Sequence, residues 1–211
     1  VQVYGRSFFA ESLLAGLTAV AILAATNSTD RVARLELIAA ALAVLAKPTG
    51  IVVGIALCLF HLASGRVVRA TASATAATAG LFAYLTYNAV RFGSPFTFGQ
   101  PWGSFRLSVI PEALAGMLAS PGRGLLWYSP VIALALYWTI RDIVQDPTRL
   151  RRPAGLALLV FLGYLGLHSL WDQWAGGWSW GPRFLVPAFP GLLAAAAASS
   201  RFRMRTLATF A

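Results

Sequence analysis

Long apolar runs alternate with short polar gaps along the whole chain. The five longest runs cover 8–26, 70–90, 125–140, 153–170 and 184–198. Their lengths approach the roughly 20 residues that a helix needs to cross the ~30 Å hydrocarbon core of a bilayer. The pattern therefore predicts an all-α fold, and more specifically a polytopic transmembrane helical bundle of about six to seven membrane segments.

The segment between the first and second of these runs is interrupted. Two apolar arms, 35–46 and 51–63, flank the sequence Lys47-Pro48-Thr49-Gly50. Proline and glycine together break a helix, so the arms form either one long broken helix or a hairpin of short helices. Lys47, the only lysine of the chain, lies at this break. It is either a ligand contact or a lysine that extends from a helix end to the membrane surface.

The longest stretch without a long apolar run is 91–123, and it contains one short helical pattern. Residues 111–119 begin with a proline, which is favoured in the first turn of a helix. Leu114, Met117 and Leu118 follow helical spacing and form one apolar face. This segment is predicted to be a short juxtamembrane helix that lies along the membrane surface.

Composition supports the membrane interpretation. Hydrophobic residues make up 58% of the 211 residues and charged residues only 11%, with a mean hydropathy of +0.68, whereas soluble domains carry about 25% charged residues. The net charge of +10 comes from arginines in short gaps between apolar runs, a pattern that indicates membrane topology and excludes nucleic acid as a partner. A single cysteine and two distant histidines indicate no metal site and no cofactor.

The distribution of arginines predicts which loops face which side. Most of them lie in the gaps 27–34, 64–69, 141–152 and 201–205, which the positive-inside rule places in the cytoplasm. The loops 91–123 and 171–183 then share the opposite face. The predicted location is the cell membrane, as a multi-pass protein whose functional loops are extracytoplasmic.

The loop at 171–183, with the sequence WDQWAGGWSWGPR, contains the most distinctive chemistry of the chain. Four of the seven tryptophans lie in it, together with three glycines. Trp178 and Trp180 offer flat faces for a sugar or for the first isoprene units of a lipid. Arg183 offers a planar charged group that fits a phosphate. The alternative is an aromatic belt at the membrane surface.

Three further charged residues are candidates for binding an anionic carrier. Arg123 lies in the turn sequence SPGRG, and Arg91 precedes a segment rich in glycine, proline and phenylalanine. Fixed cations at such positions stabilise the negative charge that develops on a leaving phosphate. Glu11 lies inside the first apolar run, where a carboxylate is either functional or reaches the interface. For each arginine the alternative is a contact with a lipid headgroup or with a helix C-terminus.

At these residues the chain resembles a known group of enzymes. The segments RFGSPFTFG (91–99), SPGRGLLWYSPV (120–131) and WAGGWSWGPRFLVPAFP (174–190) resemble the C-terminal half of bacterial GT-C glycosyltransferases. YGRSFFAESLLAG (4–16) and LAVLAKPTG (42–50) fit the same pattern. The group comprises phospholipid carrier-dependent enzymes related to protein mannosyltransferases and aminoarabinose transferases. Residues 1–211 are therefore expected to be a single transmembrane domain and the C-terminal part of a longer protein.

The resemblance implies a membrane glycosyltransferase that moves a sugar from a polyprenyl-phosphate carrier to an extracytoplasmic acceptor. The expected partners are the sugar-loaded carrier, the lipid bilayer, and a glycan, lipid or protein acceptor. The family's catalytic acid lies in a first outer loop that has no counterpart here, and the sequence contains no adjacent pair of acidic residues. The catalytic residue is therefore unassigned, and this chain alone is expected to be inactive. The alternatives are a membrane transporter and a non-catalytic subunit of a cell-envelope assembly complex.

Overall fold

The computed structural model describes residues 10–26, 30–97, 104–177 and 181–198, and this part of the chain is helical, without a strand. The α-helices are α2 (Ala10–Ala25), α3 (Asp30–Ala46), α4 (Ile51–Ala63), α5 (Val67–Phe92), α6 (Ile110–Ala119), α7 (Leu125–Tyr128), α8 (Pro130–Gln145), α9 (Pro153–Ser169) and α10 (Phe189–Ala198). Short 3₁₀ helices are η1 (Pro48–Gly50), η3 (Leu107–Val109), η4 (Pro147–Arg151) and η5 (Arg183–Ala188). The all-α part of the prediction is thus confirmed for the described residues.

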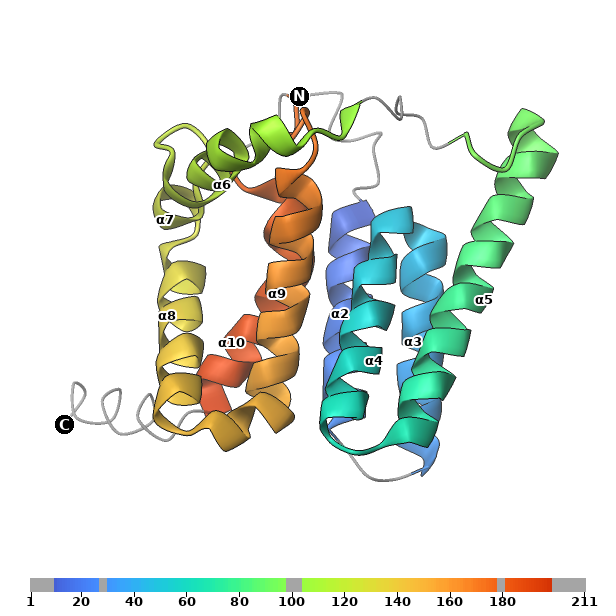
Figure 1. The fold of residues 1–211 in the computed structure, drawn as a ribbon, viewed down its shortest axis with the longest axis horizontal. Coiled ribbons are helices and arrows are strands. Elements are labelled where there is room, and N and C mark those ends of the chain that lie inside the picture. The colour runs from blue at the N-terminus through green and yellow to red at the C-terminus, as the bar shows by residue number, and fades with distance from the viewer. Residues whose placement is uncertain (1–9, 27–29, 98–103, 178–180, 199–211) are drawn as a thin grey trace.

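The helices form two groups that lie side by side (Figure 1). One group contains α2 to α5, and the other contains α6 to α10. Contacts of α4 with α9, of α2 with α10, and of α2 with η5 join the groups. Elements from the two ends of the described chain therefore meet in the middle of the molecule.

The core runs through both groups. Leu14 on α2, Leu57 and Phe60 on α4, Phe161 on α9 and Leu192 on α10 are each no more than 2% exposed, and they belong to one continuous apolar cluster. Removing these side chains from water supplies the main driving force that joins the groups.

The break at 47–50 is a hairpin. α3 ends at Ala46, η1 reverses the chain, and α4 runs back beside α3 (Figure 1). A Cβ atom on Gly50 would lie 2.1 Å from the carbonyl oxygen of Ala43, so only glycine fits this close approach. The sequence allowed either one broken helix or a hairpin of short helices. The protein forms the hairpin, with Lys47 at its tip.

The transmembrane prediction is wrong. Across the described ranges, no helix combines the length and the apolar character needed to cross a membrane. α2 and α8 have 16 residues each, and α3 and α9 have 17, which gives about 24–26 Å against a hydrocarbon core of ~30 Å. α5 is long enough at 26 residues, but threonine, serine, tyrosine and asparagine interrupt its apolar character. The predicted polytopic transmembrane bundle, and with it the multi-pass location in the cell membrane with extracytoplasmic loops, is therefore corrected.

Interruptions of the helix within two apolar runs explain part of the difference between the predicted and the observed helix lengths. The run 125–140 is divided at Ser129, where α7 ends and Pro130 begins α8. The run 184–198 begins as the 3₁₀ helix η5, with Pro187 inside it, and only 10 residues form α10. Hydropathy counts apolar residues without registering such breaks.

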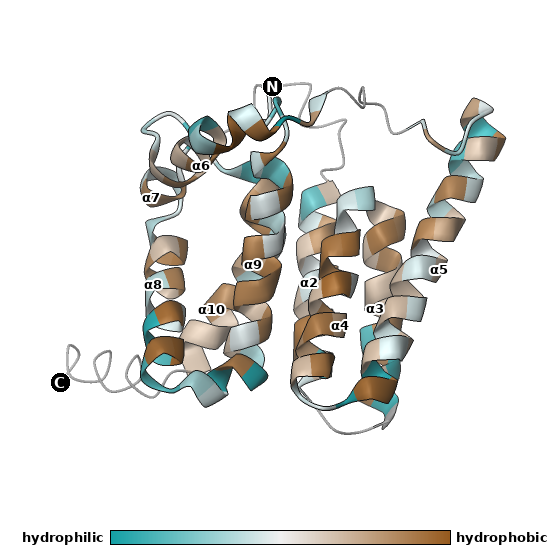
Figure 2. Ribbon diagram, viewed as in Figure 1, coloured by the Kyte–Doolittle hydropathy of each residue, from teal (hydrophilic) through white to brown (hydrophobic). Residues whose placement is uncertain are grey.

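Apolar residues occur along the helices of both groups (Figure 2), and some of them are exposed. Val68 and Val90 on α5 are 83% and 84% exposed, and Val144 on α8 is 73% exposed. These exposed residues add to the high hydropathy of the chain without adding to its core.

The short helix predicted at 111–119 is confirmed as α6. Its environment differs from the prediction, because α6 packs on α9. Ala113, Gly116 and Met117 are buried there, and Leu114 and Leu118 pack against the same core. Its apolar face therefore contacts protein.

Candidate functional site

Three charged residues that are remote in sequence meet at one end of the bundle. Glu11 lies in the first turn of α2, Lys47 at the tip of the α3–α4 hairpin, and Arg183 at the start of η5. The Nζ atom of Lys47 lies 2.8 Å from Oε1 of Glu11, and Nε of Arg183 lies 2.9 Å from the same oxygen. Two cations therefore share one carboxylate oxygen.

The backbone before Arg183 explains how this side chain reaches the cluster. Gly181 has a φ of +67°, a left-handed conformation that favours glycine, and it packs against Tyr128. Pro182 follows and restricts the next step of the chain. This turn begins η5, which contacts α2 and thereby places Arg183 beside Glu11.

The cations determine the protonation state of Glu11. The residue is only 3% exposed, and burial by itself would raise the pKa of its carboxyl group. The hydrogen bond and charge of Lys47 and the hydrogen bond of Arg183 outweigh burial, so the pKa lies below its ordinary value. Glu11 is therefore ionised at neutral pH and holds both cations in place.

A cavity of about 740 Å³ opens beside this cluster. Lys47 and Arg183 both line it, with side chains that are 23% and 33% exposed. Other parts of its wall come from α5, α9, η1 and the two long loops. These wall residues include Pro48, Thr49, Tyr84, Phe105, Leu167, His168, Trp171, Gln173, Gly176 and Phe184. The cavity thus has a largely aromatic and apolar wall and a cationic edge.

Phe184 is the common neighbour of the aromatic and charged parts of this wall. Its ring stacks on that of His168 with centroids 4.5 Å apart and planes at 5°, and it lies 5.2 Å from Trp171. Nζ of Lys47 lies 5.1 Å from the same ring, and Cζ of Arg183 lies 5.7 Å from it. Cations at these distances are attracted to the ring face.

His168 has a defined tautomer. Its Nδ1 lies 2.9 Å from the carbonyl oxygen of Tyr164, one turn earlier on α9. A carbonyl oxygen only accepts, so Nδ1 carries the proton and Nε2 of the neutral ring keeps its lone pair. Burial, with a smaller contribution from the charge of Lys47, lowers the pKa of His168 to about 4 against the opposing effects of the Tyr164 carbonyl and Glu11. The ring is neutral at pH 7.

The two distinctive loops, 91–123 and 171–183, lie against each other. Phe105 forms an isolated antiparallel bridge with Trp171. The backbone N–H of Arg106 donates to Leu170 O at 2.7 Å, and that of Asp172 donates to Ser104 O at 2.8 Å. This pairing fixes Phe105 and Trp171 in the cavity wall.

Arg123 lies in a different environment from Arg183. Its Nη1 donates to the carbonyl oxygens of Ala175 and Gly177, the latter at 2.6 Å. Next to it, the ring of Trp174 packs directly on Gly116 of α6. Arg123 therefore holds the tryptophan loop against α6 and α7, and it does not line the cavity.

The remaining predicted site residues lie elsewhere. Arg91, in the last turn of α5, donates to the hydroxyl of Tyr87 at 2.5 Å and lies over the rings of Tyr87 and Phe92, outside the cavity wall. Trp178 and Trp180 lie outside the described residues. Carrier binding by these three residues stays a prediction.

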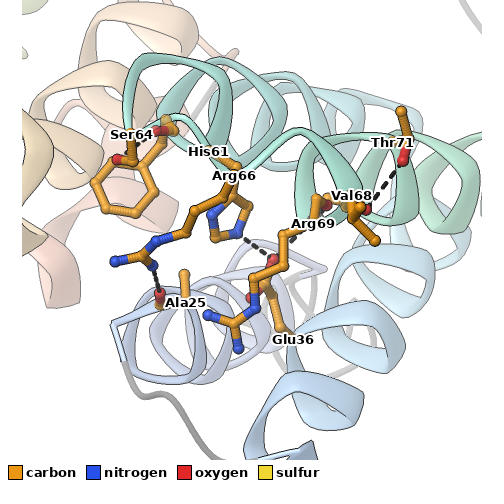
Figure 3. A network of polar contacts seen from close by, with 10 residues as sticks. Ala25, Glu36, His61, Ser64, Arg66, Val68, Arg69 and Thr71 are labelled. Carbon is orange, nitrogen blue, oxygen red and sulfur yellow. Dashed lines mark hydrogen bonds and ion pairs between the residues drawn. The ribbon is translucent and has the colours of Figure 1, made fainter.

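A second polar cluster lies at the opposite end of the first helix group (Figure 3). Oε1 of Glu36 on α3 accepts from Ser73 at 2.7 Å and lies 2.7 Å from Nε2 of His61 on α4. All three residues are at most 1% exposed. Neither this cluster nor the cavity brings three metal-ligating side chains together among the described residues.

Sequence reasoning named Glu11, Lys47 and Arg183 separately but did not group them, and it missed His168 as a site residue. One signal for His168 was available, because it lies in the last turn of a helix that leads directly into the tryptophan loop. Phe105 and Thr49 had no such signal, since only the folded loops and hairpin bring them to the cavity.

Comparison with models of known protein families, with curated proteins and with solved structures gives no match to this chain.

Proposed function

We propose that the cavity binds a polyprenyl-phosphate-linked sugar and that the protein transfers this sugar to an acceptor hydroxyl. The observation that carries the proposal is the position of Lys47 and Arg183, which share Glu11 and both line the cavity. The resemblance of the motifs around Arg183 and Lys47 to GT-C glycosyltransferases suggests which anion they bind.

The dimensions and charge of the cavity support a ligand of this class. A volume of about 740 Å³ lies within the range of about 300–1,000 Å³ that is typical of small-molecule sites. The cationic edge fits a phosphate, and the faces of Trp171 and Phe184 fit the apolar surface of a sugar ring or an isoprene unit. Tyr84 and Phe105 extend this aromatic wall.

The chemistry assigns a role to each cation. Transfer breaks the bond between the anomeric carbon and a phosphate oxygen, and negative charge develops on that oxygen. Lys47 and Arg183 are held by Glu11 before the ligand arrives, so they stabilise this charge without further reorganisation. Glu11 itself acts through the two cations and is a positioning residue.

A carrier-binding subunit without catalytic activity is the second candidate function. One observation favours it: Glu11, the carboxylate of this cluster, is already engaged by both cations. Glu11 is also only 3% exposed and is not among the described residues that line the cavity, so it does not reach a hydroxyl bound there. Transfer therefore requires a different base.

The proposal is tested by calorimetric titration with farnesyl phosphate and, in parallel, with farnesol. The wild-type protein is expected to bind the phosphate at least about tenfold more tightly than the alcohol, since a charge-assisted contact contributes about 1.5–3 kcal/mol. Lys47→Gln and Arg183→Gln should each remove most of this preference. Arg141→Gln on α8, whose guanidinium stacks on Trp138, is a matched control that should retain it.

Transfer is then measured with decaprenyl-phosphoryl mannose and decaprenyl-phosphoryl glucose as donors and octyl glycosides as acceptors. Product formation that Arg183→Gln abolishes supports the transferase. Phosphate-dependent binding without product supports the carrier-binding subunit. Equal affinity for farnesol and farnesyl phosphate would overturn both candidates, because the cations would then contribute nothing to recognition.

A further inference from the structure

The transfer proposed above needs a group that accepts the proton of the attacking hydroxyl. Glu11 is paired with two cations, and Asp172 lies near Arg106, at 3.9 Å. Among the described residues that line the cavity, none is an aspartate or a glutamate. The described part of the wall does contain one imidazole, that of His168.

The surroundings of His168 hold its ring in one orientation. Phe184 stacks on it at 4.5 Å and 5°, and Tyr164 stacks on it at 6.1 Å and 17°. The hydrogen bond from Nδ1 to the Tyr164 carbonyl oxygen fixes how the ring is turned within this stack. It also places the proton on Nδ1 and the lone pair on Nε2. A buried imidazole with a fixed tautomer is preorganised to accept a proton at one known atom.

We propose that His168 is the general base of this site, with Nε2 accepting the proton of the acceptor hydroxyl, a role that rests on the proposed transfer. The hydroxyl oxygen forms a bond to the anomeric carbon of the sugar. The bond from that carbon to the phosphate oxygen breaks, and its electron pair stays on the polyprenyl phosphate. The hydroxyl proton moves to Nε2 and then to solvent. The products are a glycoside and a polyprenyl monophosphate, and the transfer needs no oxidant or reductant.

The neighbouring charges connect donor binding to the strength of this base. In the structure, Lys47 lowers the proton affinity of the ring while Glu11 raises it. Arg183 contacts the same oxygen of Glu11 as Lys47 does. A phosphate bound to Lys47 and Arg183 adds negative charge close to the ring, which favours the protonated imidazole. The base therefore becomes stronger when the donor is in place.

Nitrogen NMR of the full chain tests the assignment directly, because the protein has only two histidines. A spectrum of the His168→Phe variant identifies the signals of His168. Between pH 5 and 8 the wild-type ring is expected to be neutral, with the proton on Nδ1. Saturation with farnesyl phosphate should shift its titration midpoint upward by at least about half a pH unit. A ring protonated on Nε2, or charged at pH 7 without ligand, would overturn the proposal.

The transfer assay supplies the second test. His168→Phe keeps an aromatic ring between Phe184 and Tyr164 but removes the nitrogen, so the fold should persist. Its transfer rate should fall at least about 100-fold, the usual contribution of a general base, while its affinity for farnesyl phosphate stays within about threefold. Ser169→Ala is the matched control from the same helical turn, where the hydroxyl bonds Gly166 O, and it should transfer at the wild-type rate.

The two proposals fail in different ways. Wild-type transfer by His168→Phe would overturn the base assignment and leave the proposed function intact. Failure of the wild-type protein to bind farnesyl phosphate would overturn the proposed function, and the base assignment with it. Restoration of transfer in His168→Ala by added imidazole would support the assignment of His168 as the base. If His168 were only structural, added imidazole would not raise the transfer rate of this variant.

Discussion

The Nε atom of Arg183 lies 2.9 Å from Oε1 of Glu11, although 172 residues separate the two in sequence. Glu11 belongs to α2, and Arg183 begins η5, so this contact joins the two helix groups at the mouth of the cavity. The candidate site therefore exists only when both ends of the described chain have packed together. Substitutions that disrupt the candidate site are therefore expected to change the stability of the fold as well.

The first prediction concerns the carboxylate that holds this contact. Glu11→Gln removes the negative charge that Lys47 and Arg183 share. Removing one partner of a fully buried pair costs about 3–5 kcal/mol. Here the cations are partly exposed and screened, so a loss of about 2 kcal/mol is expected, measured by urea denaturation.

Glu112→Gln is the control for this measurement, because Glu112 lies exposed in the first turn of α6. Its free energy of unfolding should change by no more than about 0.5 kcal/mol. Equal effects of the two substitutions would show that the contact between Glu11 and its cations adds nothing specific to stability.

Local features of this fold could be predicted from the sequence, whereas the arrangement that forms the site could not. The break at Lys47-Pro48-Thr49-Gly50 and the helix at 111–119 follow from proline, glycine and helical periodicity, which act over a few residues. Hydropathy gave the wrong answer for the bundle, because it does not register that the apolar runs 125–140 and 184–198 are each divided between two shorter helices.

The candidate site shows the same division. Glu11 and Lys47 each stood out as charges in apolar surroundings, and Arg183 stood out in a loop of unusual composition. That they share one oxygen depends on how α2, the hairpin and η5 pack, and no local pattern encodes this packing. The sequence gives little indication that His168 belongs to the site, because its environment depends on the stacked ring of Phe184.

The second prediction is a pH dependence of stability that originates in His168. The unfolded chain protonates this histidine below its ordinary pKa of 6.5, whereas the folded protein does so only near 4. Between these values the unfolded state binds more protons, so the free energy of unfolding falls as the pH drops from 6.5 to 4. The loss approaches about 3 kcal/mol, at about 1.4 kcal/mol per pKa unit.

Denaturation of the wild-type protein and of His168→Phe at several pH values measures this contribution. The variant should be less sensitive to pH between 6.5 and 4. Glu11 adds a separate loss at lower pH, because its lowered pKa contributes stability that is fully present above 4.5 and disappears as the carboxylate is protonated. Parallel curves for the two proteins down to pH 4 would contradict the assignment to His168.

The third prediction concerns the buried cluster of Glu36, His61 and Ser73. Glu36→Leu should destabilise the protein by about 3–5 kcal/mol, because His61 loses its partner in a site without access to water. The combined change Glu36→Leu, His61→Leu and Ser73→Ala removes the polar groups together and should recover most of this loss. The unfolding temperatures of the two variants, compared with that of the wild-type protein, measure both effects. Equal destabilisation of both would show that the volume of the side chains, and not polar pairing, dominates at this end of the bundle.

The last prediction concerns the turn that positions Lys47. Gly50→Ala would place a methyl group 2.1 Å from the carbonyl oxygen of Ala43, so the hairpin must open. Overpacking of this kind costs about 1–3 kcal/mol, and the displaced Lys47 should bind farnesyl phosphate more weakly.

Gly16→Ala on α2 is the matched control, because a Cβ atom there meets nothing within 4 Å. It should stabilise the helix by about 0.5–1 kcal/mol and leave farnesyl phosphate binding unchanged. If Gly50→Ala loses stability but keeps full affinity, the position of Lys47 does not depend on this turn, and the hairpin serves the fold alone.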